Sequence, residues 1–162
     1  MTREHDETLQ AIAEETFESL AFVLAMPEEM DDAADEPLGP GVTARISFTG
    51  PFEGTLFLAA SADVVEPTAA NMLALIDGEV PTGEQQADAF RELLNVICGN
   101  LLPALAGTAP VFDVGAAEIL GDEPIPEQFQ QRPPTATVRL CLEFGPAELA
   151  LFVHGEVAVE AC

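Results

Sequence analysis

The chain has 162 residues, which suits one compact domain, and 48% of them are hydrophobic, enough for a real core. It carries 29 acidic residues against 5 basic ones, a formal net charge of −24. That balance argues against a nucleic-acid partner, because such binding needs Lys and Arg to displace counterions from the phosphates. It argues equally against docking on an anionic membrane surface.

The sequence indicates a cytoplasmic protein. Met1–Glu7 is polar and does not resemble a signal peptide, and no stretch approaches the ~20 apolar residues of a membrane span. The three cysteines, Cys98, Cys141 and Cys162, are odd in number and form no CxxC pair, which fits reduced thiols in the cytosol. With only two distant histidines besides, we expect no metal site in the chain.

The first forty residues predict a helix and a loop. Apolar side chains recur at helical spacing over Thr8–Ala25, and Pro27 closes the pattern. The following Glu28–Pro40 is acidic and contains proline and glycine, which indicates a loop.

A hairpin and a second helix follow. Val42–Thr49 alternates apolar and polar residues, and Gly54–Ala60 is apolar, so we expect two strands turned at Gly50-Pro51. We expect a helix over Asp63–Ile76 that Gly78 ends. Two further features of that helix are a cap at Ser61 or Asp63 and Pro67 in its first turn.

The second half begins with a long helix. It starts at Thr82 or Gly83 and runs to about Leu101, and Pro103 is expected to kink or end it. A strand is predicted over Val111–Ile119.

A second hairpin closes the chain. Gly121–Pro134 holds four prolines and is expected to be a loop. Thr135–Phe144 alternates, Gly145-Pro146 is predicted to turn the chain, and Glu148–His154 is predicted to pair back.

The two halves share one pattern. Residues 8–78 and 82–155 each contain a long helix and a hairpin with Gly-Pro near its turn. A duplicated helix–hairpin unit predicts an α+β fold: one domain over residues 1–162, with long helices packed on a largely antiparallel sheet.

The helix over 88–101 has two distinct faces. At about 100° per residue, one face collects the apolar side chains and must be buried. The opposite face carries Asp88, Glu92, Asn95 and Gly99. Glu92 and Asn95 are three residues apart, so their Cβ atoms lie roughly 5–6 Å apart.

Two residues on that face are hard to explain as helix design. Asn95 has mediocre helix propensity, and in mid-helix its side chain finds no free backbone group to cap. Gly99 costs about 1 kcal/mol against alanine, and a bare glycine lets another molecule approach the backbone. Because ExxN is a short pattern, an ordinary solvated helix face with an indifferent asparagine is the alternative.

Residues 92–100, ELLNVICGN, resemble the ExxN…GN signature of the CheC/CheX/FliY phosphatase family. The likeness covers the chain from Thr8 to about His154. The CheC-like members carry a second ExxN on the first helix, whereas no glutamate of that helix here has an asparagine three residues on. The resemblance therefore implies the CheX branch, the CheC-like fold and one active site per chain.

The resemblance also implies a reaction and its participants. The substrate would be the aspartyl phosphate of a CheY-like receiver, with Mg²⁺ supplied by the receiver and no cofactor of the chain's own. Asn95 would position the attacking water, and Glu92 would pair with the receiver's lysine, its role as a general base being the weaker alternative. Gly99 would admit the receiver's loop, and Asp88 lies on the same face as a candidate contact.

Two other classes of function stay open on the sequence. The same fold could bind a receiver, or a flagellar or chemoreceptor partner, without turnover. It could also be a structural or dimerisation domain, if the Glu92 face is buried in an interface. The resemblance further implies a homodimer in which edge strands pair into a continuous sheet.

Overall fold

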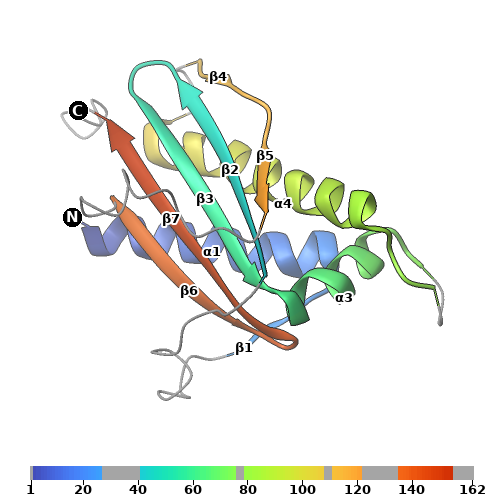
Figure 1. Ribbon diagram of the computed structural model, residues 1–162. Coiled ribbons are helices and arrows are strands. Elements are labelled where there is room, and N and C mark those ends of the chain that lie inside the picture. Colours follow the sequence, from blue (N-terminus) through green and yellow to red (C-terminus); the bar gives the residue numbers. More distant parts are fainter. Residues whose placement is uncertain (1, 27–40, 76–78, 108–110, 122–134, 155–162) are drawn as a thin grey trace.

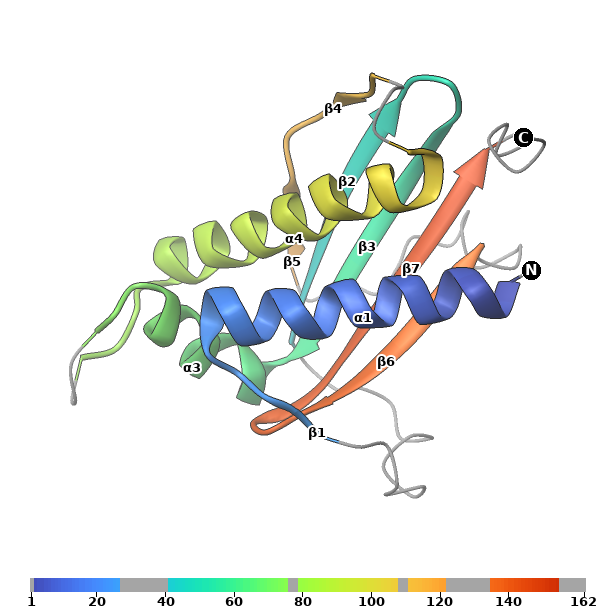
Figure 2. The same ribbon diagram turned by 180° about the vertical axis from the view of Figure 1, so that it is seen from behind.

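A computed structural model describes residues 2–26, 41–75, 79–107, 111–121 and 135–154. Within these ranges one antiparallel sheet is covered on one face by three helices, which confirms the predicted α+β class (Figure 1; Figure 2). The helices are α1 (Thr2–Ala21), α3 (Ala62–Met72) and α4 (Gly83–Ala106). The strands are β1 (Ala25–Met26), β2 (Gly41–Thr49), β3 (Glu53–Ser61), β4 (Asp113–Val114), β5 (Glu118–Gly121), β6 (Ala136–Leu142) and β7 (Gly145–His154).

Two hairpins form the centre of the sheet. The strand order is β1-β6-β7-β3-β2-β4, with β5 also paired to β2, and every pairing is antiparallel. The predicted β2–β3 and β6–β7 hairpins are confirmed, and β3 pairs with β7 to join them. The predicted halves, 8–78 and 82–155, therefore share one sheet, while their duplication and the single-domain assignment stay predictions.

The first hairpin turns where the sequence places its turn. Phe48 pairs with Gly54, so the chain reverses through Gly50-Pro51. Phe48, Phe52 and Phe112 pack edge to face, with ring centroids 5.1–6.0 Å apart. This aromatic cluster fixes the tip of the hairpin to the segment that follows α4.

The second hairpin turns two residues earlier than predicted. Leu142 pairs with Gly145, so the two turn residues are Glu143 and Phe144 rather than Gly145-Pro146. Gly145 instead begins β7 at φ 148°, a conformation that favours glycine. A Cβ at this position would lie 3.0 Å from Ser61 Oγ and 3.1 Å from Val64 Cγ2, so a side chain here would also crowd the start of α3.

The first helix ends earlier than its apolar periodicity predicts. α1 ends at Ala21, and Phe22 leaves the helix at φ 55°. The Leu24 side chain, expected on the buried face, is 52% exposed. The backbone of Leu24 is instead hydrogen-bonded to Glu143, because this segment turns to form the edge strand β1. The predicted helix over Thr8–Ala25 is therefore wrong at both ends.

The other helix boundaries also differ from the prediction. α3 ends at Met72, short of Ile76, and Pro67 lies in its interior rather than its first turn. α4 continues past Pro103 to Ala106, where the prediction ended near Leu101. Gly78, the predicted end of α3, lies outside the described residues, as does the predicted loop Glu28–Pro40.

The strand predicted over Val111–Ile119 is in fact two short strands. β4 and β5 both pair with β2, and between them the N–H of Gly115 donates to the carbonyl of Ser47. Gly121, the first residue of the loop predicted over Gly121–Pro134, is instead the last residue of β5. Residues 122–134 of that loop lie outside the described part of the chain.

The core lies between the sheet and the helices. α1 and α4 lie side by side across one face of the sheet, and α3 packs beside α4 (Figure 2). Their apolar faces meet the inward side chains of β2, β3, β6 and β7 in one buried cluster. None of the described helices has the length and apolar character to cross a membrane.

Candidate active site

The site helix α4 is fixed at its start by a capping box. The side chain of Thr82 accepts a hydrogen bond from the N–H of Gln85 at 3.1 Å, and the Gln85 side chain accepts from the N–H of Thr82 at 2.9 Å. These reciprocal bonds satisfy two backbone donors that a helix start would leave unpaired. The far end stops at Gly107, whose φ of 80° a residue with a side chain rarely adopts.

The buried face of α4 is the one that the sequence predicts. Its large apolar side chains have no exposed surface, and they pack against the sheet, α1 and α3. They are Phe90, Leu93, Leu94, Ile97 and Leu101. Because this face is held by the core, the rotation of α4 about its axis is fixed, and with it the direction of the opposite face.

All four predicted site residues lie on that opposite face and are exposed: Asp88, Glu92, Asn95 and Gly99. Neither Glu92 nor Asn95 makes a side-chain hydrogen bond or ion pair with the part of the chain that the structure describes. A carboxylate and a carboxamide therefore project side by side from a rigid helix, both available to another molecule. The reading of this face as a buried structural interface gains no support from the single chain.

Asp88 is engaged within the helix. Its carboxylate forms an ion pair with Arg91, three residues on, and the two side chains are 65% and 38% exposed. The spacing alone could have predicted this pair, because opposite charges three residues apart on a helix are neighbours. Asp88 therefore lies beside Glu92 as half of a neutral pair and not as a second free carboxylate.

Gly99 has open space above it. A Cβ built at this position meets no atom within 4 Å outside the helix's own backbone. Internal packing therefore does not require a glycine here, unlike at Gly145. The helix carries a residue of poor propensity at an exposed position where the fold would accept alanine.

The surface near the site has no free guanidinium among the described side chains. Arg91 pairs with Asp88, Arg45 with Glu118 at 2.7 Å, and Arg139 with Glu148 at 2.8 Å. The described residues also contain no group of three or more His, Cys, Asp and Glu side chains that could hold a metal ion.

Cys98 lies in the same helix but on its buried face. Burial raises the pKa of its thiol from 9.0 to about 11, because the interior disfavours the charged thiolate. The thiol therefore stays protonated at neutral pH and is a packing residue rather than a nucleophile.

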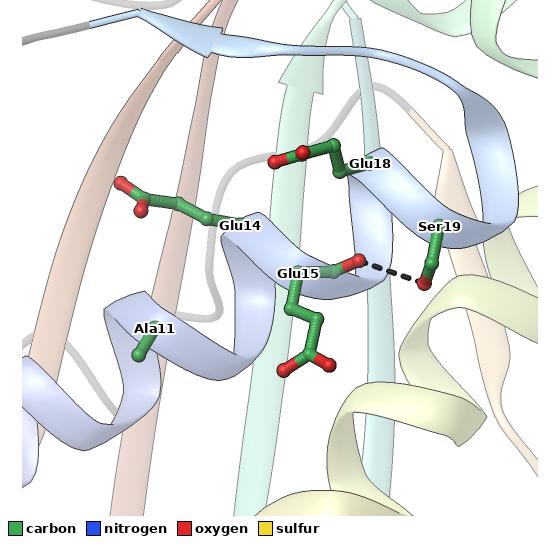
Figure 3. A pocket seen from close by; sticks show the side chains of 5 residues that line it. All are labelled: Ala11, Glu14, Glu15, Glu18 and Ser19. Carbon is green, nitrogen blue, oxygen red and sulfur yellow. Dashed lines mark hydrogen bonds between the residues drawn. The ribbon is translucent and has the colours of Figure 1, made fainter.

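The first helix carries a shallow depression with a different character. It has a volume of about 380 Å³ and is lined by Ala11, Glu14, Glu15, Glu18 and Ser19. In Figure 3 the carboxylates of Glu14 and Glu18 point to one side of the helix and that of Glu15 points away from them, and the hydrogen bond drawn runs from the Ser19 hydroxyl to the carbonyl of Glu15 at 2.8 Å. No asparagine lies beside these glutamates, so α1 does not repeat the Glu92–Asn95 arrangement.

Comparisons with known proteins match both the overall fold and the part of the chain that contains α4. Residues 42–117, which include β2, β3, α3 and α4, match the model of the family described as chemotaxis phosphatase CheX. No curated protein gives a significant sequence match.

Several solved structures share the fold over nearly the whole chain. A chemotaxis protein CheX from Desulfovibrio desulfuricans is 13% identical with a TM-score of 0.69, and the match covers 93% of this chain and 99% of that one. A CheC-like superfamily protein from Shewanella sp. PV-4 is 15% identical with a TM-score of 0.69, covering 96% and 100%.

A third structure holds a partner. It is the CheX-CheY-BeF3-Mg²⁺ complex from Borrelia burgdorferi, 17% identical with a TM-score of 0.65, covering 92% of this chain and 97% of that one. The family match spans the helix that carries Glu92 and Asn95, and the fold agrees from α1 to β7. Over residues 42–117 the chain is thus similar to the family of the chemotaxis phosphatase CheX, and its fold is similar to that of CheX and CheC-like proteins.

Proposed function

We propose that the chain hydrolyses the aspartyl phosphate of a CheY-like receiver, with Asn95 and Glu92 as its catalytic residues. The observation that carries this proposal is the exposed pair on α4, whose side chains find no partner within the described chain. The family match and the relative solved with CheY, BeF3 and Mg²⁺ support a receiver as the partner.

The chemistry suits an amide better than a strong base. Water attacks phosphorus, the bond between phosphorus and the aspartyl oxygen breaks, and the carboxylate and inorganic phosphate are released. Since the transition state of phosphoryl transfer is loose, the water needs little deprotonation when it attacks. The Asn95 carboxamide has a donor and an acceptor, so it can hold the water in line with the phosphorus.

Glu92 is proposed to dock on the receiver. A carboxylate next to Asn95 can pair with the lysine beside the phosphorylated aspartate, and such a charge-assisted bond fixes where the water lies relative to the phosphorus. The receiver would bring its own Mg²⁺, which supplies positive charge for the phosphoryl oxygens. The described surface around Glu92 has no free guanidinium to do so.

Gly99 and the Asp88–Arg91 pair are proposed as partner contacts. The empty space at Gly99 lets a loop of the receiver approach the helix closely. Asp88, already balanced by Arg91, adds little repulsion toward an acidic receiver.

The direct test is loss of phosphate from a receiver labelled with a small phosphodonor in the presence of Mg²⁺. Asn95→Ala is expected to lower the rate on the order of 10²-fold, as for loss of one oriented polar group. Its matched control is Asn71→Ala, which removes the asparagine of α3, away from the site face. Equal rates for wild type and Asn95→Ala would exclude the enzyme reading and favour a receiver-binding module.

A homodimer in the cytoplasm is the proposed working form. Cys98 and Cys141 are free thiols, as a reducing compartment would leave them. The sheet ends in short edge strands, and the apolar Val111 and Val114 beside one edge are 82% and 45% exposed. Sedimentation equilibrium is expected to give twice the chain mass of 17.1 kDa, and a single-chain mass at all concentrations would contradict the dimer.

A further inference from the structure

Pro103 lies inside α4, on the face that carries the proposed site. At about 100° per residue, Asp88, Glu92, Asn95, Gly99 and Pro103 fall within an arc of about 80°. All five are exposed. Pro103 is not at the helix end, since α4 runs on to Ala106 and the carbonyl of Pro103 accepts a bond from Gly107 at 2.8 Å.

A proline inside a helix removes one hydrogen bond. It has no N–H, so it cannot donate to the carbonyl four residues before it, and its ring pushes against that carbonyl. Here that carbonyl belongs to Gly99. It is not one of the last four carbonyls that every helix leaves unpaired, because the carbonyl of Pro103 still accepts a bond from Gly107 and the unpaired ones begin at residue 104.

The backbone of Gly99 is also open to solvent on its side-chain face. Gly99 has no side chain, and a Cβ added there would meet no atom within 4 Å beyond the local helix backbone. Helical carbonyls point toward the C-terminal end, so this one lies between Gly99 and Pro103 at the surface. It is about 6 Å further along the axis than Asn95, at a rise of ~1.5 Å per residue.

We infer that Pro103 frees the Gly99 carbonyl to accept a hydrogen bond from the docked receiver, which makes Gly99 and Pro103 one backbone docking point beside Glu92 and Asn95. This inference rests on the proposed function, because the receiver supplies the donor. It also explains why a costly proline and a costly glycine stand four residues apart on an exposed face. The carbonyl touches the partner and not the reacting atoms, so its contribution belongs in KM.

A purely structural alternative makes a different prediction. Gly99 could serve only to relieve the clash between its carbonyl and the Pro103 ring. Removing the ring would then leave receiver docking unchanged. In Pro103→Ala the new N–H can instead close the helical bond and occupy the carbonyl, which would weaken docking.

The test compares Pro103→Ala with Pro67→Ala, the matched removal of a proline from the interior of α3. The readouts are KM and kcat for receiver dephosphorylation, and affinity for the receiver activated with beryllofluoride and Mg²⁺. Loss of one hydrogen bond predicts KM and Kd raised about 3–10-fold in Pro103→Ala, with kcat unchanged. Pro67→Ala is expected to match wild type in all three.

Two further readouts separate docking from folding. Thermal unfolding of Pro103→Ala should occur at or above the wild-type Tm, because the helix has regained a bond. Hydrogen exchange should show a protected amide at residue 103, which means that the Gly99 carbonyl is occupied.

Each outcome decides a different statement. If wild type acts on a receiver and Pro103→Ala has the same KM and Kd with a protected amide, the inference is overturned while the proposed function stands. If Pro103→Ala and Pro67→Ala raise KM equally, a general effect of helix stability explains the change and the inference is overturned. If wild type neither binds nor dephosphorylates any receiver, the proposed function fails and the inference with it.

Discussion

At the scale of single residues, Glu92 and Asn95 owe their availability to what surrounds them. The neighbouring charges on α4 neutralise each other as the Asp88–Arg91 pair, so Glu92 has no cationic partner among the described side chains. Asn95 is too far from either helix end to cap a backbone group. Both side chains therefore keep their hydrogen-bonding capacity for a partner.

Substituting Glu92 separates its two candidate roles. Glu92→Gln keeps the shape but removes the charge, so pairing with a receiver lysine predicts KM raised roughly 10-fold and kcat little changed. If Glu92 is a general base, the substitution should instead lower kcat by about 10²-fold or more. Steady-state kinetics of receiver dephosphorylation, with Glu15→Gln on α1 as the control, measures which parameter moves.

Cys98 predicts a pH dependence of stability. Its thiol has a pKa of 9.0 when unfolded and about 11 when folded, so the folded state holds the proton more tightly. The stabilisation is complete below pH 9 and is lost as the pH rises toward 11. Two pKa units correspond to roughly 2–3 kcal/mol.

Urea unfolding of wild type and Cys98→Ala across this pH range measures the effect. The wild type should lose about that much free energy of unfolding relative to the variant between pH 9 and 11. Parallel curves for the two proteins would mean that the thiol ionises equally in both states.

At the scale of elements, the capping box determines how firmly α4 begins. Thr82→Ala removes the acceptor for the Gln85 N–H and is expected to cost about 1 kcal/mol of unfolding free energy. Thr82→Ser keeps the hydroxyl and should cost much less. Since the site face starts at Asp88, beyond the first turn, kcat should be unchanged in both variants, and chemical denaturation with kinetics on the folded protein checks this.

Element boundaries were the least predictable part of the sequence. The periodic stretch that ends α1 continues through Leu24, but pairing of this segment with β6 and Glu143 competes with one more helical turn and wins. Pro103 was expected to end or kink α4, yet the helix continues because Ala106 and Leu102 remain buried in the core. Tertiary packing decided both boundaries, and local propensity could not.

At the scale of the whole molecule, charge is the dominant feature. A net charge of −24 is spread over a 162-residue chain, and the three arginine side chains that the structure describes, Arg45, Arg91 and Arg139, are each paired with a carboxylate. Long-range repulsion would therefore oppose encounter with an acidic receiver, and the proposed short-range contact at Glu92 would have to attract it.

Ionic strength should therefore act in two opposite directions. Raising salt from low to physiological levels screens the long-range repulsion and is expected to increase the association rate of the receiver. The same salt weakens the exposed Glu92–lysine contact, so the dissociation rate should increase too. Stopped-flow binding at several salt concentrations measures both rates, and an association rate that falls with salt would contradict net repulsion between the partners.

The sequence by itself determined the α+β class, both hairpins and the two faces of α4, because these depend on local periodicity that survives any packing. It also indicated Glu92, Asn95, Asp88 and Gly99 as one face, since helical spacing alone places them together. Only the tertiary structure decided that this face is open and that no atom of the fold fills the space at Gly99. Exposure and contact depend on residues distant in sequence, so no local pattern could have supplied them.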